Sequence, residues 1–122
     1  MAGKLMVEFK SPKKKLFIFE LANNHNGNFD NAIKLIKSIE NLKNFNNLEY
    51  AVKLQYRDLP SFLYKKKVKN KHVDRFNSTK LSKNIFEKIC KRIKKKFKLV
   101  ITPFDEKSVK LAINHKVDIL KI

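Results

Sequence analysis

Polar side chains stand at the ends of four short apolar segments of this sequence. They are Glu20, then Lys53 and Gln55, then Thr102, and finally Lys121. Lys53 has an apolar neighbour on each side, and an unpaired ammonium group in such a segment is costly, so we expect it to bind a functional anion. Taken singly, Glu20 could cap a helix or join a salt bridge, and Thr102 and Lys121 could be ordinary strand-end residues. Polar groups at four successive segment ends together indicate a functional site.

The four apolar segments have the composition of β-strands. The predicted strands are residues 16–19, 50–55, 99–102 and 117–122. The first is a continuous apolar run, which is typical of a strand buried on both faces.

Three amphipathic segments that separate the strands predict helices. An apolar stripe follows Asn28 or Asp30, either of which can cap it, and ends before 44–47; the others cover 82–97 and 105–115. Ser82 and Asp105 are their expected caps. Residues 56–80 show no sustained period and predict a long loop, in which Arg57 and Arg75 could equally meet a substrate or the solvent.

Alternation of strands and helices predicts an α/β fold with a parallel sheet. Neither Gly-x-Gly-x-x-Gly nor Gly-x-x-x-x-Gly-Lys occurs, which argues against a dinucleotide fold and a P-loop. In an α/β barrel the carboxyl ends of the strands hold the active site. Four strands are half of such a barrel, so residues 1–122 are expected to form the N-terminal half of a TIM (β/α)8 barrel.

Charge and cysteine content narrow the class of protein. The chain has 29 Lys+Arg against 11 Asp+Glu, a net charge of +18. A small polyanion-binding module is therefore an alternative, although only three basic residues are arginine and the lysines are spread along the chain. A single cysteine, Cys90, lies on an apolar helix face and suits a buried, inert thiol. One cysteine and no long apolar run favour a soluble cytoplasmic protein without a membrane partner.

Four ordered motifs resemble the N-acetylneuraminate (sialic acid) synthase family. Residues 20–27, Glu-Leu-Ala-Asn-Asn-His-Asn-Gly, are similar to its Glu-Ile-Gly-Asn-Asn-His-Asn-Gly motif, and residues 52–55 to its Val-Lys-Phe-Gln strand. Thr-Pro-Phe-Asp at 102–105 matches a third motif, and 118–122 is similar to the start of a Lys-Ile-Ala-Ser strand.

The resemblance implies a fold and an activity. Family members have a TIM barrel and a small antifreeze-like C-terminal domain, and they are homodimers. These transferases condense phosphoenolpyruvate with an N-acyl amino sugar such as N-acetylmannosamine and release phosphate, in surface carbohydrate biosynthesis such as that of capsule or lipopolysaccharide. A divalent metal, Mn²⁺ or Mg²⁺, assists. A nucleic-acid partner is not expected.

By the same resemblance, Glu20 is the catalytic acid or base. Lys53 and Thr102 would hold the substrate carboxylate, Lys121 the phosphate and Gln55 the sugar. Asn24 is a further substrate-binding candidate.

Some residues depart from the family pattern. Ala22 replaces a usual glycine, a mild change if φ is negative there, and Tyr56 stands where many members have Thr, which leaves the sugar open. The family's metal-binding histidines and the serine after Lys-Ile are absent, so no metal site is expected within this chain. His25 is expected to hold the Asn-rich turn. We expect the 122 residues to be inactive alone, or to act only when paired with another half-barrel.

Overall fold

The computed structural model describes residues 13–62 and 71–122 as alternating strands and helices. The strands are β1 (Lys15–Ala22), β2 (Leu48–Tyr56), β3 (Lys98–Pro103) and β4 (Ile119–Leu120). The helices are α1 (Phe29–Glu40), α2 (Leu59–Phe62), α3 (Lys71–Ser78), α4 (Lys83–Lys94) and α5 (Glu106–Asn114).

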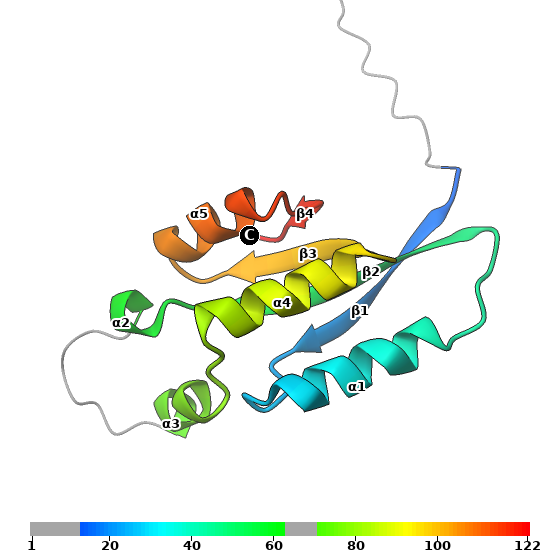
Figure 1. Cartoon of the computed structure of the whole chain (residues 1–122). Helices are drawn as coiled ribbons and strands as arrows, with labels where there is room; N and C mark the ends of the chain where they lie inside the picture. Colours follow the sequence, from blue (N-terminus) through cyan, green and yellow to red (C-terminus); the bar gives the residue numbers. More distant parts are fainter. Residues whose placement is uncertain (1–12, 63–70) are drawn as a thin grey trace, which may run out of the picture.

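The strands form one parallel sheet in chain order, β1-β2-β3-β4 (Figure 1). Val52 of β2 is aligned with Phe19 on one side and Leu99 on the other. The α/β class and the parallel sheet are therefore confirmed. The described sheet is open at β1 and β4; it is compatible with half of a barrel, and barrel closure stays a prediction.

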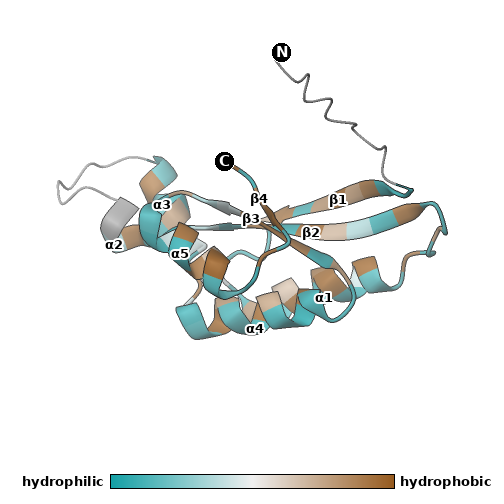
Figure 2. Ribbon diagram, turned by 90° about the horizontal axis from the view of Figure 1, so that it is seen from above, coloured by the Kyte–Doolittle hydropathy of each residue, from teal (hydrophilic) through white to brown (hydrophobic). Residues whose placement is uncertain are grey.

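The long helices pack against one face of the sheet. Figure 2 shows α1 and α4 side by side beneath the strands, and α5 adds Leu111 and Ala112 to the same core. This core is apolar and fully buried at its centre, where Ile36 of α1, Ile89 of α4 and Ile101 of β3 are each 0% exposed. Cys90 lies in it, as predicted.

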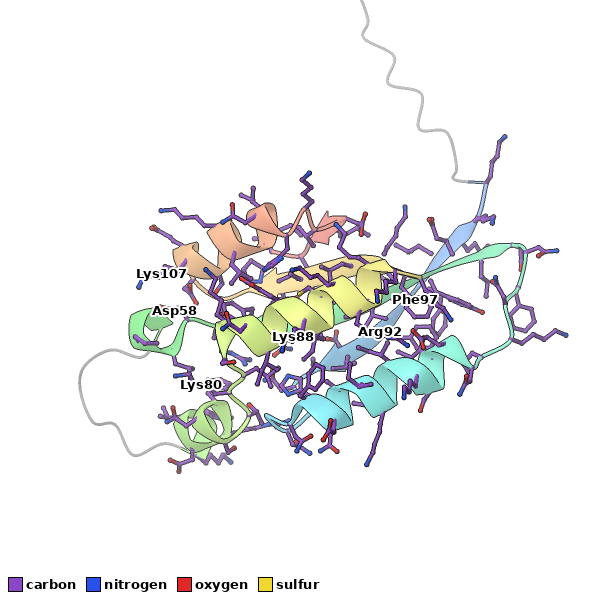
Figure 3. The ribbon with its side chains drawn as sticks, viewed as in Figure 1. Asp58, Lys80, Lys88, Arg92, Phe97 and Lys107 are labelled. Carbon is purple, nitrogen blue, oxygen red and sulfur yellow. The ribbon has the colours of Figure 1, made fainter. Side chains whose placement is uncertain are left out.

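An ion pair joins α1 to α4 at the side of this core. Arg92 of α4 is labelled in Figure 3; its Nη2 lies 2.7 Å from Glu40 Oε2 of α1, and the Glu40 side chain is only 8% exposed. A nearly buried carboxylate needs such a partner.

No helix in the described residues is long and apolar enough to cross a membrane.

The predicted helix caps are confirmed. Asn28, Ser82 and Asp105 each have extended backbone, and each side chain accepts a hydrogen bond from the backbone N–H three residues on. These bonds satisfy amide groups that a helix N-terminus otherwise leaves without partners. For α1, the structure thereby selects Asn28 over Asp30.

The prediction of a structureless loop over 56–80 is wrong where the chain is described. Helices α2 and α3 lie in it, while residues 63–70 fall outside the described part. A four-residue helix and an eight-residue helix are too short for a sustained apolar period. Short helices are held by tertiary contacts rather than by their own propensity, and the contact of Phe76 with Arg57 is such a contact.

The prediction that the first strand is buried on both faces is also wrong for the described residues. Leu16, Phe17 and Ile18 are 38%, 50% and 41% exposed. In the described sheet β1 is an edge strand that pairs only with β2, and the long helices cover one sheet face. Its apolar side chains therefore remain accessible.

Candidate functional site

The sheet face opposite the helices carries a row of polar side chains, which we call the strand-end row: Glu20, Lys53, Gln55 and Thr102. Strand pairing aligns Glu20 with Lys53 and Gln55 with Thr102. Side chains alternate between the two faces of a strand, and Val52, Leu54 and Ile101 point into the helix-covered core. The row residues between them therefore share the uncovered face, near the carboxyl ends of three neighbouring strands.

Lys121 follows β4 at the same edge. Its backbone N–H donates to Ile101 O at 3.0 Å, which continues the β3–β4 pairing. Lys121 lies two residues after Ile119, so both belong to the same side of the strand, and Ile119 is aligned with Val100 of the uncovered face. The structure thus brings Lys121 to the same edge of the sheet, although its side chain is exposed.

In the structure, Lys53 meets an internal carboxylate, that of Glu20; a functional anion at Lys53 stays a prediction. The two side chains form an ion pair, with Lys53 14% and Glu20 46% exposed. Because Glu20 is half open to water, the pair contributes modestly to stability. An anion from solution can therefore compete with Glu20 for Lys53 at small cost.

The Gln55 amide is held by two donors. Its Oε1 accepts from Arg57 Nη2 at 2.7 Å and from Asn23 Nδ2 at 3.5 Å. Asn23 rather than Asn24 makes this contact, so Asn24 stays a prediction from the resemblance.

Arg57 lies between two aromatic rings. Its guanidinium carbon is 4.0 Å from the ring centroid of Phe76 and 4.1 Å from that of Phe104. Burial, and secondarily the charge of Arg75, lower the pKa of Arg57. The sequence left two roles open for Arg57, contact with a substrate or with the solvent. In the structure Arg57 instead binds the side chain of Gln55, which is itself a candidate substrate-binding residue.

The hydroxyl of Thr102 is buried, and within the described residues its Oγ1 has no hydrogen-bond partner. Leaving a buried polar group unsatisfied costs roughly 1–3 kcal/mol. Thr102 is aligned with Gln55 on the uncovered face. Such a hydroxyl is suited to bind a ligand oxygen there.

The Asn-rich turn after β1 is built around a buried histidine. His25 is 2% exposed, and its Nδ1 accepts from the Gly27 N–H at 3.0 Å. Burial lowers the pKa of His25, so its neutral form with the proton on Nε2 is favoured. Gly27 has a φ of +70°, and a Cβ there would lie 2.8 Å from Ser78 O. The predicted structural role of His25 fits this geometry.

The condition under which Ala22 would be a mild replacement is not met. Ala22 has a φ of +47°, in the left-handed region that a residue with a Cβ rarely adopts. The strand pairing shifts register between Glu20 and Ala22. This irregular strand end requires the backbone conformation in which glycine is free of strain.

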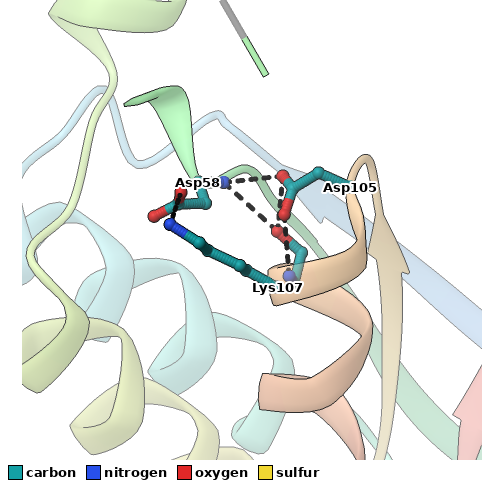
Figure 4. A network of polar contacts seen from close by, with 4 residues as sticks. Asp58, Asp105 and Lys107 are labelled. Carbon is teal, nitrogen blue, oxygen red and sulfur yellow. Dashed lines mark hydrogen bonds and ion pairs between the residues drawn. The ribbon is translucent and has the colours of Figure 1, made fainter. Parts of the chain in front are cut away.

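The last residue of the Thr-Pro-Phe-Asp motif organises a polar network (Figure 4). Asp105 accepts from Ser108 N through Oδ1 and from Asp58 N through Oδ2, both at 2.8 Å. Ser108 is fully buried and also donates from Oγ to Asp105. Lys107 Nζ lies 3.3 Å from Asp58 Oδ2. Asp105 thus joins the start of α5 to the segment after β2.

A concave surface lies at the opposite, amino-terminal edge of the sheet, away from the strand-end row, and we call it the basic groove. It measures about 680 Å³ and includes Lys95, Lys96 and Lys98 among its lining residues. Lys98 is paired with Glu49 at 3.2 Å. Lys94 donates to the carbonyls of His115 and Lys116, so it is not simply a solvated charge.

Metal binding and thiol chemistry find little support in the described residues. They contain no group of three His, Cys, Asp or Glu side chains that could hold a metal ion. Glu20 is paired with Lys53, and His25 Nδ1 with a backbone amide. The residues present therefore do not supply the family's metal site.

Burial raises the pKa of Cys90 to about 12, which suits an inert thiol.

The fold and the strand-end row define an α/β protein with polar groups at the carboxyl edge of a parallel sheet. No family model and no curated protein matches the chain. Among solved structures, it is similar to a crystal structure from Chromobacterium violaceum that is assigned as spore coat polysaccharide biosynthesis protein E. The two are 41% identical, with a TM-score of 0.81 over 89% of this chain. The chain spans 34% of that protein.

Proposed function

We propose that this chain supplies the first half of a synthase barrel that condenses phosphoenolpyruvate with an N-acyl amino sugar in surface carbohydrate biosynthesis. The observation that carries the proposal is the strand-end row, where an ammonium, an amide, an unsatisfied hydroxyl and a carboxylate share one sheet face. The solved structure described above, with its assignment to polysaccharide biosynthesis, supports the carbohydrate context.

The row offers suitable groups for a small dianionic substrate. The Lys53 ammonium and the Thr102 hydroxyl would bind the carboxylate of phosphoenolpyruvate, since charge-assisted hydrogen bonds are the strong ones. Lys121, at the same edge, would bind the phosphate. The Gln55 amide would hydrogen-bond the sugar.

Glu20 would change partner during the reaction. When the substrate carboxylate takes Lys53, the Glu20 carboxylate is released and can transfer a proton. In the reaction, C3 of phosphoenolpyruvate bonds to the aldehyde carbon of the sugar, whose oxygen takes a proton. Water then adds to C2, and the C2–O bond to phosphate breaks. Glu20 would exchange a proton with either the aldehyde oxygen or this water. No step is assigned to a metal, because the described residues lack its ligands.

Calorimetric titration of the chain with phosphoenolpyruvate tests the proposal. We expect saturable binding with a Kd on the order of a millimolar, and at least a fivefold weaker affinity in Lys53→Met. Lys98→Met is the matched control, because Lys98 also lies in the sheet and pairs with a glutamate, but at the other edge. Absence of saturable binding, or equal binding by wild type and Lys53→Met, would contradict the proposal.

A further inference from the structure

We infer that Arg57 is a positioning residue that orients the Gln55 amide, so that its NH2 group faces the uncovered sheet face and reads an acceptor oxygen of the substrate. This inference rests on the proposed function for the identity of the substrate, but its structural part does not.

Two rings from different elements hold the guanidinium. Phe76 belongs to α3 and Phe104 follows β3, and both centroids lie within 4.1 Å of the guanidinium carbon. A planar guanidinium stacks on rings in a way that an ammonium cannot reproduce. The buried Nε of Arg57 has no hydrogen-bond partner within the described residues, so the two rings and the Nη2 bond to Gln55 hold the guanidinium. The rings therefore leave Nη2 aimed at Gln55.

The bond from Arg57 fixes which end of the Gln55 amide is which. A glutamine side chain has an acceptor end and a donor end, and its neighbours decide which way it points. Here Oε1 accepts from the 2.7 Å bond of Arg57 and the 3.5 Å bond of Asn23. A flipped amide would put its NH2 group against two donors and lose both bonds. Arg57, with the shorter and charged bond, is the stronger constraint.

The donor end of the Gln55 amide is left available to a ligand. Within the described residues, Gln55 Nε2 donates no hydrogen bond. Gln55 stands beside Thr102 on the uncovered face, and the Thr102 hydroxyl also lacks a partner there. Gln55 therefore presents donors, and the group it recognises is an acceptor such as the carbonyl oxygen of an N-acyl group. A site built to hydrogen-bond one group discriminates strongly against analogues that lack it.

NMR of the Gln55 side-chain NH2 group tests the inference directly. In the wild type we expect a dispersed, ordered NH2 pair, as judged by its ¹H–¹⁵N NOE. In Arg57→Lys and Arg57→Met the pair should become mobile and move to random-coil positions. Arg75→Met is the matched control, because it removes a nearby charge that lowers the pKa of Arg57 but leaves Arg57, Phe76 and Phe104 themselves unaltered, and it should leave the NH2 pair unchanged. Backbone spectra verify folding; should Arg57→Met unfold, Arg57→Lys decides.

Addition of N-acetylmannosamine gives the functional readout. We expect it to shift the Gln55 NH2 resonances of the wild type, with about fivefold to tenfold weaker affinity in Arg57→Lys. An ordered NH2 pair in the arginine variants would overturn the inference. An ordered wild-type pair that depends on Arg57 but does not respond to the sugar would uphold the positioning role, overturn its link to the substrate and count against the proposed function.

Discussion

At the scale of single residues, two cations of the candidate site each contact another side chain of the chain: Lys53 contacts Glu20, and Arg57 contacts Gln55. The sequence predicts a functional anion at Lys53, whereas the structure shows the ammonium paired with Glu20 on the neighbouring strand, a salt bridge of the kind that the sequence also allowed for Glu20. Nothing in the sequence shows that Arg57 would be enclosed between Phe76 and Phe104, because these side chains come from separate segments of the chain. Only the fold brings them together. An arginine two residues after Gln55 is a signal that could have prompted the question.

Ala22 provides a residue-scale prediction about stability. A left-handed conformation costs a residue with a Cβ roughly 1–2 kcal/mol, and part of the gain from glycine is offset in the unfolded chain. We expect Ala22→Gly to raise the free energy of unfolding by about 1 kcal/mol in urea denaturation. Ala32→Gly, within α1, should lower it by about 1 kcal/mol or more. A less stable Ala22→Gly variant would contradict the strain assigned to this position.

At the scale of elements, periodic segments are predictable and short ones are not. Helices α1, α4 and α5 follow from their apolar stripes and caps, and the four strands from their apolar runs. Boundaries shift by a few residues; the segment predicted as 82–97 is helical over Lys83–Lys94. The sequence does not predict helices α2 and α3, because four and eight residues are too few for an apolar period, and α3 is held by a contact with the distant Arg57. The Asp105 network is of the same kind, since Asp105 is recognisable as a cap but its bond to Asp58 spans 47 residues.

The network predicts that Asp105 contributes to two elements at once. Asp105→Ala removes the cap of α5 and the 2.8 Å bond that the Asp58 N–H donates, while its longer 3.2 Å bond to Ser108 Oγ is retained. A lost cap alone costs about 1 kcal/mol, and we expect a total destabilisation of about 2 kcal/mol in chemical denaturation. Glu106→Ala, one residue on and exposed, should change stability by less than about 0.5 kcal/mol. Equal effects of the two substitutions would show that the network is unimportant.

At the scale of the whole molecule, the structure separates two edges of the sheet with different chemistry. The carboxyl edge has the strand-end row, and the amino-terminal edge has the basic groove. A net charge of +18 suggests a polyanion surface when considered alone. Two lysines of the groove, however, have internal partners: Lys98 pairs with a carboxylate and Lys94 with backbone carbonyls. The location of anion binding therefore distinguishes the synthase proposal from the polyanion alternative.

Backbone NMR mapping of phosphoenolpyruvate on the ¹⁵N-labelled chain tests the central claim most directly. The account predicts saturable shifts concentrated at Glu20, Lys53, Gln55 and Thr102, reduced by Lys53→Met and persisting at about 0.1 M salt. Shifts confined to the basic groove around Lys95 and Lys98, unaffected by Lys53→Met and abolished by salt, would contradict it and favour the polyanion reading.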